Sequence, residues 1–153
     1  MTTTLSDADL TVRVTEDITL NGRTLGNTNT HTIKGINEVS ERIFTVPTSE
    51  ITVLSSSSGL GAGTFLSSSI KYVRFTNLDD ANFVRLTFTS SSAGSAKNKA
   101  VFKLEPQRSF MITNDAYSGS AAGDTFHSFQ SYTSIKAAAN SAACDIEMFV
   151  ATT

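Results

Sequence analysis

Residues 70–89 read IKYVRFTNLDDANFVRLTFT, and this stretch decides the fold class. It holds two runs in which β-branched and aromatic side chains alternate with polar ones, the period expected of a half-buried strand. An Asp- and Asn-rich turn joins the runs, so the pattern predicts an antiparallel hairpin with Arg74 and Arg85 facing outward. The alternation gathers five apolar side chains on the face expected to be core: Val73, Phe75, Val84, Leu86 and Phe88.

The rest of the chain repeats this pattern of short extended runs separated by polar turns. Asn21-Gly22 can supply the positive φ angles of a type I′ turn, which predicts a second hairpin. Residues 36–46 could begin as a helical turn, but their end, IFTV before Pro47, favours a strand. Other short strands are predicted at residues 51–54, 101–104, 109–113 and 144–151.

One segment, residues 134–143, is a candidate helix because it is rich in alanine. It lacks a good cap and an amphipathic pattern, and a parallel α/β fold would need several longer helices between its strands. Short strands with polar turns roughly every 8–12 residues are typical of an antiparallel sandwich or barrel. We therefore expect an all-β fold of about eight antiparallel strands.

The composition limits the classes of function. A length of 153 residues fits one domain. Serine and threonine make up 43 of the residues, while the formal net charge is only −2. Nucleic-acid binding needs clustered Lys and Arg to displace counterions, so we expect no nucleic-acid partner. The sequence has no run of 18 apolar residues and no signal-peptide pattern at its start, so we also expect no membrane partner and no export.

The expected domain organisation is an N-terminal arm at residues 1–9 and a single β-sandwich domain at residues 10–153. The region around the arm carries scattered acidic residues: Asp7, Asp9, Glu16 and Asp17. Such an arm is either a solvated tail or a segment that reaches a neighbouring subunit, and the sequence leaves both interpretations open.

The sequence shows no catalytic motif. His31 and His127 have no Cys, His or carboxylate at a metal-ligand spacing, and there is no G-x-S-x-G element. GLGAG at residues 59–63 is not followed by the G-K-[ST] of a phosphate-binding loop. Cys144 is the single cysteine, and we expect it to be a buried, small apolar side chain. We therefore expect no catalytic, cofactor-binding or metal-binding residue, no cofactor, no small-molecule substrate and no enzymatic activity.

The acidic turn of the opening stretch has a second possible interpretation. Asp79, Asp80 and Asn82 are oxygen-bearing residues, but they lack the alternate spacing and the distal glutamate of a calcium loop. We expect them to form a turn, with a weak surface cation site as the alternative.

A Gly- and Ser-rich region holds the candidate binding residues, which are four aromatic side chains: Tyr117, Phe126, Phe129 and Tyr132. Exposed aromatic residues in loops would suit a carbohydrate or a receptor. The lack of tryptophan weakens this hypothesis.

Three stretches resemble the small structural proteins of tailed bacteriophages, particularly those of marine and cyanobacterial phages. They are INEVSERIFTVPTSEITVL at residues 36–54, IKYVRFTNLDDANFVRLTF at residues 70–88 and CDIEMFVATT at residues 144–153. None contains a catalytic motif, and all three are strand-and-turn sequences. The resemblance implies a Ser/Thr-rich, jelly-roll-like β-sandwich that forms part of the virion.

The function implied by this resemblance is that of a capsid decoration (cement) subunit, which stabilises the phage head by binding between major shell proteins. The implied partners are further copies of this chain, often as a homotrimer, and a major capsid or other virion protein. The implied location is the virion, after assembly in the host cytoplasm. The alternatives are a neck, tail or fibre component of the virion, or a carbohydrate- or receptor-binding β-sandwich.

Overall fold

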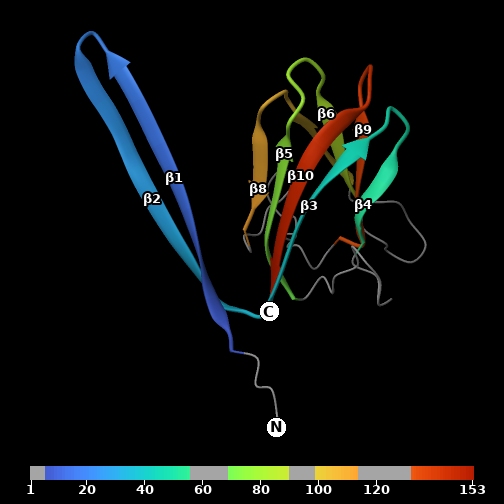
Figure 1. Ribbon diagram of the computed structural model, residues 1–153, viewed down its shortest axis with the longest axis horizontal. Helices are drawn as coiled ribbons and strands as arrows, with labels where there is room; N and C mark the ends of the chain where they lie inside the picture. Colours follow the sequence, from blue (N-terminus) through green and yellow to red (C-terminus); the bar gives the residue numbers. More distant parts are fainter. Residues whose placement is uncertain (1–5, 56–68, 90–98, 114–131) are drawn as a thin grey trace, which may run out of the picture.

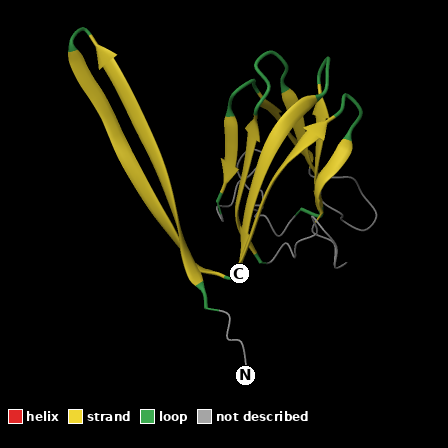
Figure 2. Ribbon diagram, viewed as in Figure 1, coloured by secondary structure: helices red, strands yellow, loops and turns green. Residues whose placement is uncertain are grey.

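The computed structural model describes residues 6–55, 69–89, 99–113 and 132–153, and within these ranges the regular structure consists of β-strands (Figure 2). This confirms the predicted all-β class. In the same ranges there is no helix that is long and apolar enough to cross a membrane.

The first two strands form a long ribbon of their own. β1 (Ala8–Leu20) pairs antiparallel with β2 (Arg23–Ile36), and neither strand pairs with any other strand in the described part of the chain. Asn21 and Gly22 connect them with φ angles of 51° and 76°, so the predicted tight turn is confirmed. We call β1 and β2 the ribbon; it projects away from the rest of the chain (Figure 1).

The other eight strands form two antiparallel four-stranded sheets packed face to face (Figure 1). One sheet has the order β3-β10-β5-β8, with bounds Glu38–Val46, Cys144–Thr152, Ile70–Asn77 and Ser109–Ile112. The other has the order β4-β9-β6-β7, with bounds Ile51–Ser55, Ser134–Ala139, Val84–Thr89 and Lys99–Leu104. Successive strands alternate between the sheets except β6 and β7, which are neighbours in one sheet. This order is that of a jelly roll, so the predicted jelly-roll-like β-sandwich of about eight strands is confirmed.

The prediction that residues 70–89 form a hairpin is wrong. β5 pairs with β10 and β8, whereas β6 pairs with β7 and β9, so the two runs belong to opposite sheets. The alternating pattern shows which face of a strand is buried, but not which strand lies beside it. The connection from Asn77 to Val84 crosses the edge of the sandwich instead of reversing within one sheet.

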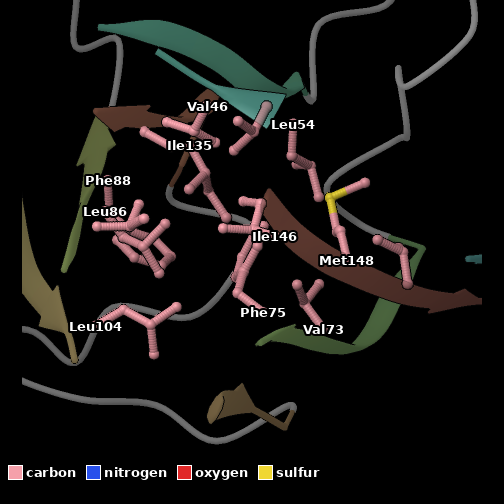
Figure 3. Packing of buried hydrophobic residues seen from close by; sticks show 14 of the residues in the cluster. Val46, Leu54, Val73, Phe75, Leu86, Phe88, Leu104, Ile135, Ile146 and Met148 are labelled. Carbon is pink, nitrogen blue, oxygen red and sulfur yellow. The ribbon is translucent and has the colours of Figure 1, made fainter. Parts of the chain in front are cut away.

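The core lies between the two sheets (Figure 3). The five residues predicted for the apolar face are all buried there, with Val73 and Phe75 from one sheet facing Val84, Leu86 and Phe88 from the other. The inward-facing side chains of β5 and β6 thus pack into one shared core, as the alternating pattern requires.

Two segments whose sequences left helix and strand both open form strands. The alanine-rich segment forms β9, in which Ala137 and Ala139 are buried between the sheets because a small side chain fits a crowded interior. β3 is extended from Glu38 onward, so no helical turn precedes Ile43-Phe44-Thr45-Val46.

Candidate functional site

The four candidate aromatic residues do not form a surface that the structure describes. Tyr132 is only 4% exposed, and its ring lies 5.2 Å from the ring of Phe88, so it belongs to the core and not to an exposed binding surface. Tyr117, Phe126 and Phe129 lie outside the described residues. The position of Tyr132 beside a Ser-rich stretch of sequence was therefore not a reliable signal of exposure.

The residues that could carry reactive chemistry differ in their exposure, and some of them lie outside the described residues. Cys144 is buried at the start of β10, and burial, followed by the charges of Asp79 and Asp145, raises the pKa of its thiol. A thiol with a raised pKa is a poor nucleophile, which agrees with the predicted structural role. His31 is exposed on β2, whereas His127 lies outside the described residues, as does the glycine-rich segment 59–63.

In the acidic turn between β5 and β6, polar side-chain atoms form hydrogen bonds with the backbone. Asp79 Oδ1 accepts hydrogen bonds from the backbone N–H groups of Ala81 and Asn82, which lower the pKa of its carboxyl group. The buried Asn77 donates from Nδ2 to the carbonyls of Asn82 and Leu104, at 2.8 and 3.3 Å. These contacts confirm the predicted turn.

The same end of the sandwich has a polar hollow of about 650 Å³ lined by Asp79, Asp80, Asp145 and Thr45. Thr45 Oγ1 donates a hydrogen bond of 2.6 Å to Asp145 Oδ1. Among the described residues, no group of three or more His, Cys, Asp or Glu side chains is placed to hold a metal ion.

The ribbon is the most unusual surface of the molecule, because its two faces differ in chemistry. Residues opposite each other in the register share a face, so one face carries cross-strand threonine pairs. Thr15 lies opposite Thr28 and Thr19 opposite Thr24, with Oγ1 atoms 3.1 and 3.4 Å apart. Hydroxyl groups can bond to one another or to water, so this face is suited to solvent.

The opposite face of the ribbon, which we call the apolar face, carries most of the ribbon's hydrophobic side chains. Its hydrophobic members are Leu10, Val12, Val14, Ile18, Leu20, Leu25 and Ile33, and the register places the polar residues Glu16, Arg23, Asn27, Asn29 and His31 on the same face. Near the turn, Ile18 lies opposite Leu25, and the two side chains are 56% and 53% exposed. Leu20 is 57% exposed beside them. Contiguous exposed apolar residues of this kind mark an interaction surface more often than isolated ones.

The base of the apolar face packs on the sandwich. Leu10, Val12 and Ile33 contact a small cluster formed by Ile36, Tyr72 and Ala151, together with Phe149. The rings of Tyr72 and Phe149 meet edge to face, with centroids 5.9 Å apart. Burial in this cluster raises the pKa of the Tyr72 hydroxyl. The ribbon is therefore anchored at one end by hydrophobic contacts.

A cleft opens between the ribbon and the outer face of the β3-β10-β5-β8 sheet. It has a volume of about 320 Å³, and Val12, Val14 and His31 of the ribbon line it opposite Tyr72 and Met111 of the sheet. Met111 is 43% exposed, and Ile43 and Val39 on the same outer face are 65% and 52% exposed. The cleft thus has apolar side chains on both walls.

Sequence reasoning predicted the turn of the ribbon but not its role. The alternation of Leu10, Val12 and Val14 with Thr11, Arg13 and Thr15 is visible in the sequence. That alternation indicates an amphipathic strand, but it equally fits a strand inside the sandwich. The length of the two alternating segments on either side of Asn21-Gly22 is the sequence feature that could have distinguished a separate ribbon from strands of the sandwich.

Comparison with known proteins gives limited information. No protein-family model matches the sequence, and no curated protein shows significant similarity to it. A solved structure that is similar comes from work titled "Bacillus endospore appendages form a novel family of disulfide-linked pili". The likeness covers 76% of this chain and 85% of the other, with 12% sequence identity and a TM-score of 0.43. At this level the likeness carries no conclusion about function.

Proposed function

We propose that this chain is a structural protein of a virion, and that it acts as a capsid decoration (cement) subunit that binds between major shell proteins. In this proposal the chain has no enzymatic activity, and it functions by docking to other proteins in the particle. It assembles in the host cytoplasm and remains in the virion, where it forms a homo-oligomer such as a trimer.

The observation that carries the proposal is the exposed apolar face of the ribbon on an otherwise well-packed sandwich. In the isolated molecule Ile18, Leu20 and Leu25 are each more than half exposed to water. Their burial against another protein would add roughly 25 cal/mol for each Å² of apolar surface removed from water. An assembling subunit explains this arrangement better than a free monomer does.

The architecture supports a role outside the protected environment of a cell. The one cysteine is buried and free, so the sandwich holds by core packing and strand pairing without a disulfide. A jelly roll limits the number of strand edges that can aggregate, which favours stability at high local concentration. The sequence resemblance to phage structural proteins supports the virion as the location of this protein.

The test is to purify phage particles that encode this chain and to measure its abundance relative to the major shell protein by quantitative mass spectrometry. Hundreds of copies in each particle would support a decoration role, whereas a few tens or fewer would indicate a neck, tail or fibre component. If purified particles lack the chain, the virion proposal is wrong. Binding of the purified chain to a glycan array would instead favour the receptor-binding alternative.

A further inference from the structure

The cleft at the base of the ribbon has the size of a small-molecule site. It opens where the ribbon and the β3-β10-β5-β8 sheet diverge from the hydrophobic contacts that join them (Figure 1). Its volume of about 320 Å³ lies at the lower end of the range for ligand pockets, which is about 300–1,000 Å³. A cleft of this size can receive one small molecule, but not a folded segment of another chain.

The two walls of the cleft are apolar where they approach each other. Val12 and Val14 of β1 line one wall, and Met111 of β8 lines the other. Val14 is 39% exposed and Met111 is 43% exposed, so water contacts apolar side chains on both walls. Replacing this water with an apolar group is favourable. The main part of a ligand that fits here is therefore apolar.

Tyr72 adds one specific polar group to the cleft. The residue is only 5% exposed, and it lines the cleft from β5. Burial raises the pKa of its hydroxyl, the charge of Arg74 partly offsets this effect, and no hydrogen bond from a described residue contributes. The hydroxyl therefore keeps its proton and can donate it. Because a buried hydroxyl without a partner is costly, an acceptor atom on a ligand would stabilise this arrangement.

The charges around the cleft favour an uncharged ligand. None of the described residues that line it is Asp, Glu, Lys or Arg. Arg74, which lies beside Tyr72 on the same strand, already forms an ion pair with Glu147. A charged ligand would lose hydration without gaining an opposite charge. The exposed side chains of Asn29 and His31 add polar groups that a neutral ligand can tolerate.

We propose that this cleft binds a small uncharged molecule that combines an apolar ring or branched chain with one hydrogen-bond acceptor. Val12, Val14 and Met111 hold the apolar part, and the Tyr72 hydroxyl donates a hydrogen bond to the acceptor. The site binds its ligand without changing it. This inference goes beyond the proposed structural role and does not depend on which particle contains the protein.

The test uses two probes that share an aromatic ring and differ in the acceptor. Acetophenone carries a carbonyl oxygen, whereas toluene has no hydrogen-bonding group. Two-dimensional NMR of the isotope-labelled full-length chain should show both probes shifting the amide signals of Val12, Val14, Tyr72 and Met111. Acetophenone should bind about two- to tenfold more tightly than toluene, as one added neutral hydrogen bond predicts.

Two substitutions separate the contributions of the polar group and the apolar wall. Tyr72→Phe removes the hydroxyl and keeps the ring, so it should weaken acetophenone binding about two- to tenfold and leave toluene binding unchanged. Val14→Asp places a carboxylate on the apolar wall and should weaken binding of both probes about fivefold or more. Its control is Thr15→Asp, one residue away on the opposite face of the ribbon, which should bind both probes as wild type does. Circular dichroism and the melting midpoint check that each variant folds.

Three results would overturn the inference. If neither probe shifts the amide signals of the cleft at millimolar concentration, the site does not exist. Equal weakening of both probes by Tyr72→Phe would mean that the ring packing has changed, and it would remove the hydroxyl from the site. Wild-type binding by Val14→Asp would place the probes elsewhere. Probe binding by a chain that virions lack would leave this inference intact and remove only the virion proposal.

Discussion

Arg74 on β5 and Glu147 on β10 form an ion pair on the outer face of their sheet, and the side chains are 27% and 19% exposed. The guanidinium group also donates a hydrogen bond of 2.7 Å to Thr76 Oγ1. The hydrogen bond from Arg74 is the main reason that the pKa of Glu147 lies below its usual range. The pair therefore links the stability of this sheet to pH.

We expect Arg74→Met to reduce the pH dependence of stability in acid. A glutamate whose pKa is lowered by folding adds stability above the pKa of the unfolded chain, about 4.3, and this stability is lost as the pH falls through the folded-state pKa. Without Arg74, the pKa of Glu147 returns toward its usual range, so less stability is lost between about pH 6 and pH 3. Urea midpoints at both pH values measure the change. Arg85→Met is the control, because Arg85 is 53% exposed and 4.0 Å from Glu50.

Phe88→Ala should lower the free energy of unfolding by about 3–5 kcal/mol. Phe88 is 1% exposed, and its ring meets those of Phe102 and Tyr132 at centroid distances of 5.4 and 5.2 Å. Phe75→Ala should have a similar effect from the opposite sheet. Denaturant unfolding measures both changes, and Val101→Ala on the exposed side of β7 should stay within about 0.5 kcal/mol of wild type. A Phe88→Ala midpoint equal to that of wild type would mean that this side of the core is assigned wrongly.

Asn77→Leu should destabilise the protein by about 1–3 kcal/mol although it adds apolar volume. The Asn77 side chain is fully buried, donates to the carbonyls of Asn82 and Leu104, and accepts from the N–H of Asp79. Leucine leaves these three backbone groups without that partner. Thermal or urea unfolding gives the change, and Asn140→Leu, at an exposed position, is the control. Equal stability of Asn77→Leu and wild type would show that water replaces the lost contacts.

Gly26→Ala should loosen the ribbon and leave the sandwich intact. A Cβ atom at residue 26 would lie 2.0 Å from the carbonyl oxygen of Glu16 on β1, so the strands must move apart there. Hydrogen exchange should become faster between residues 14 and 29, while amides of β5 and β10 keep wild-type protection. Thr28→Ala, on the same strand, should cause a much smaller change. Wild-type protection of the ribbon in Gly26→Ala would contradict the described register.

The Cys144 thiol should react with a thiol-specific reagent only when the protein unfolds. Cys144 is fully buried, and burial raises the pKa of the thiol, which lowers its thiolate fraction. Its reaction rate in native buffer should therefore follow the rate or extent of opening, and it should rise steeply in denaturant. Rapid labelling of the native protein would show that the start of β10 opens locally.

The sequence was most informative where burial follows a simple alternation. The inward residues of β5 and β6 could be assigned from their period of two, because a core between sheets imposes that period on both strands. Their pairing could not be assigned, since stacking across the core and pairing within a sheet produce the same pattern. The contacts of Asn77 with Asn82 and Leu104 show how the chain crosses between the sheets, and no local motif encodes that crossing.

The candidate site was less accessible to sequence reasoning. Tyr132 resembled a loop aromatic residue because its neighbours are serine, glutamine and threonine, yet it completes the ring cluster around Phe88. The importance of Ile18 and Leu25 depends on their exposure, which only the arrangement of the ribbon relative to the sandwich reveals. Local sequence describes the faces of a strand, whereas exposure depends on the whole fold.

The length of the ribbon has a consequence for spacing. About a dozen residue pairs at roughly 3.4 Å each place the Asn21-Gly22 turn some 40 Å from the base. In an array joined through its ribbons, this span would set the distance between neighbouring subunits. Insertion or deletion of two residues in each strand would preserve which face is apolar while changing the repeat of the array.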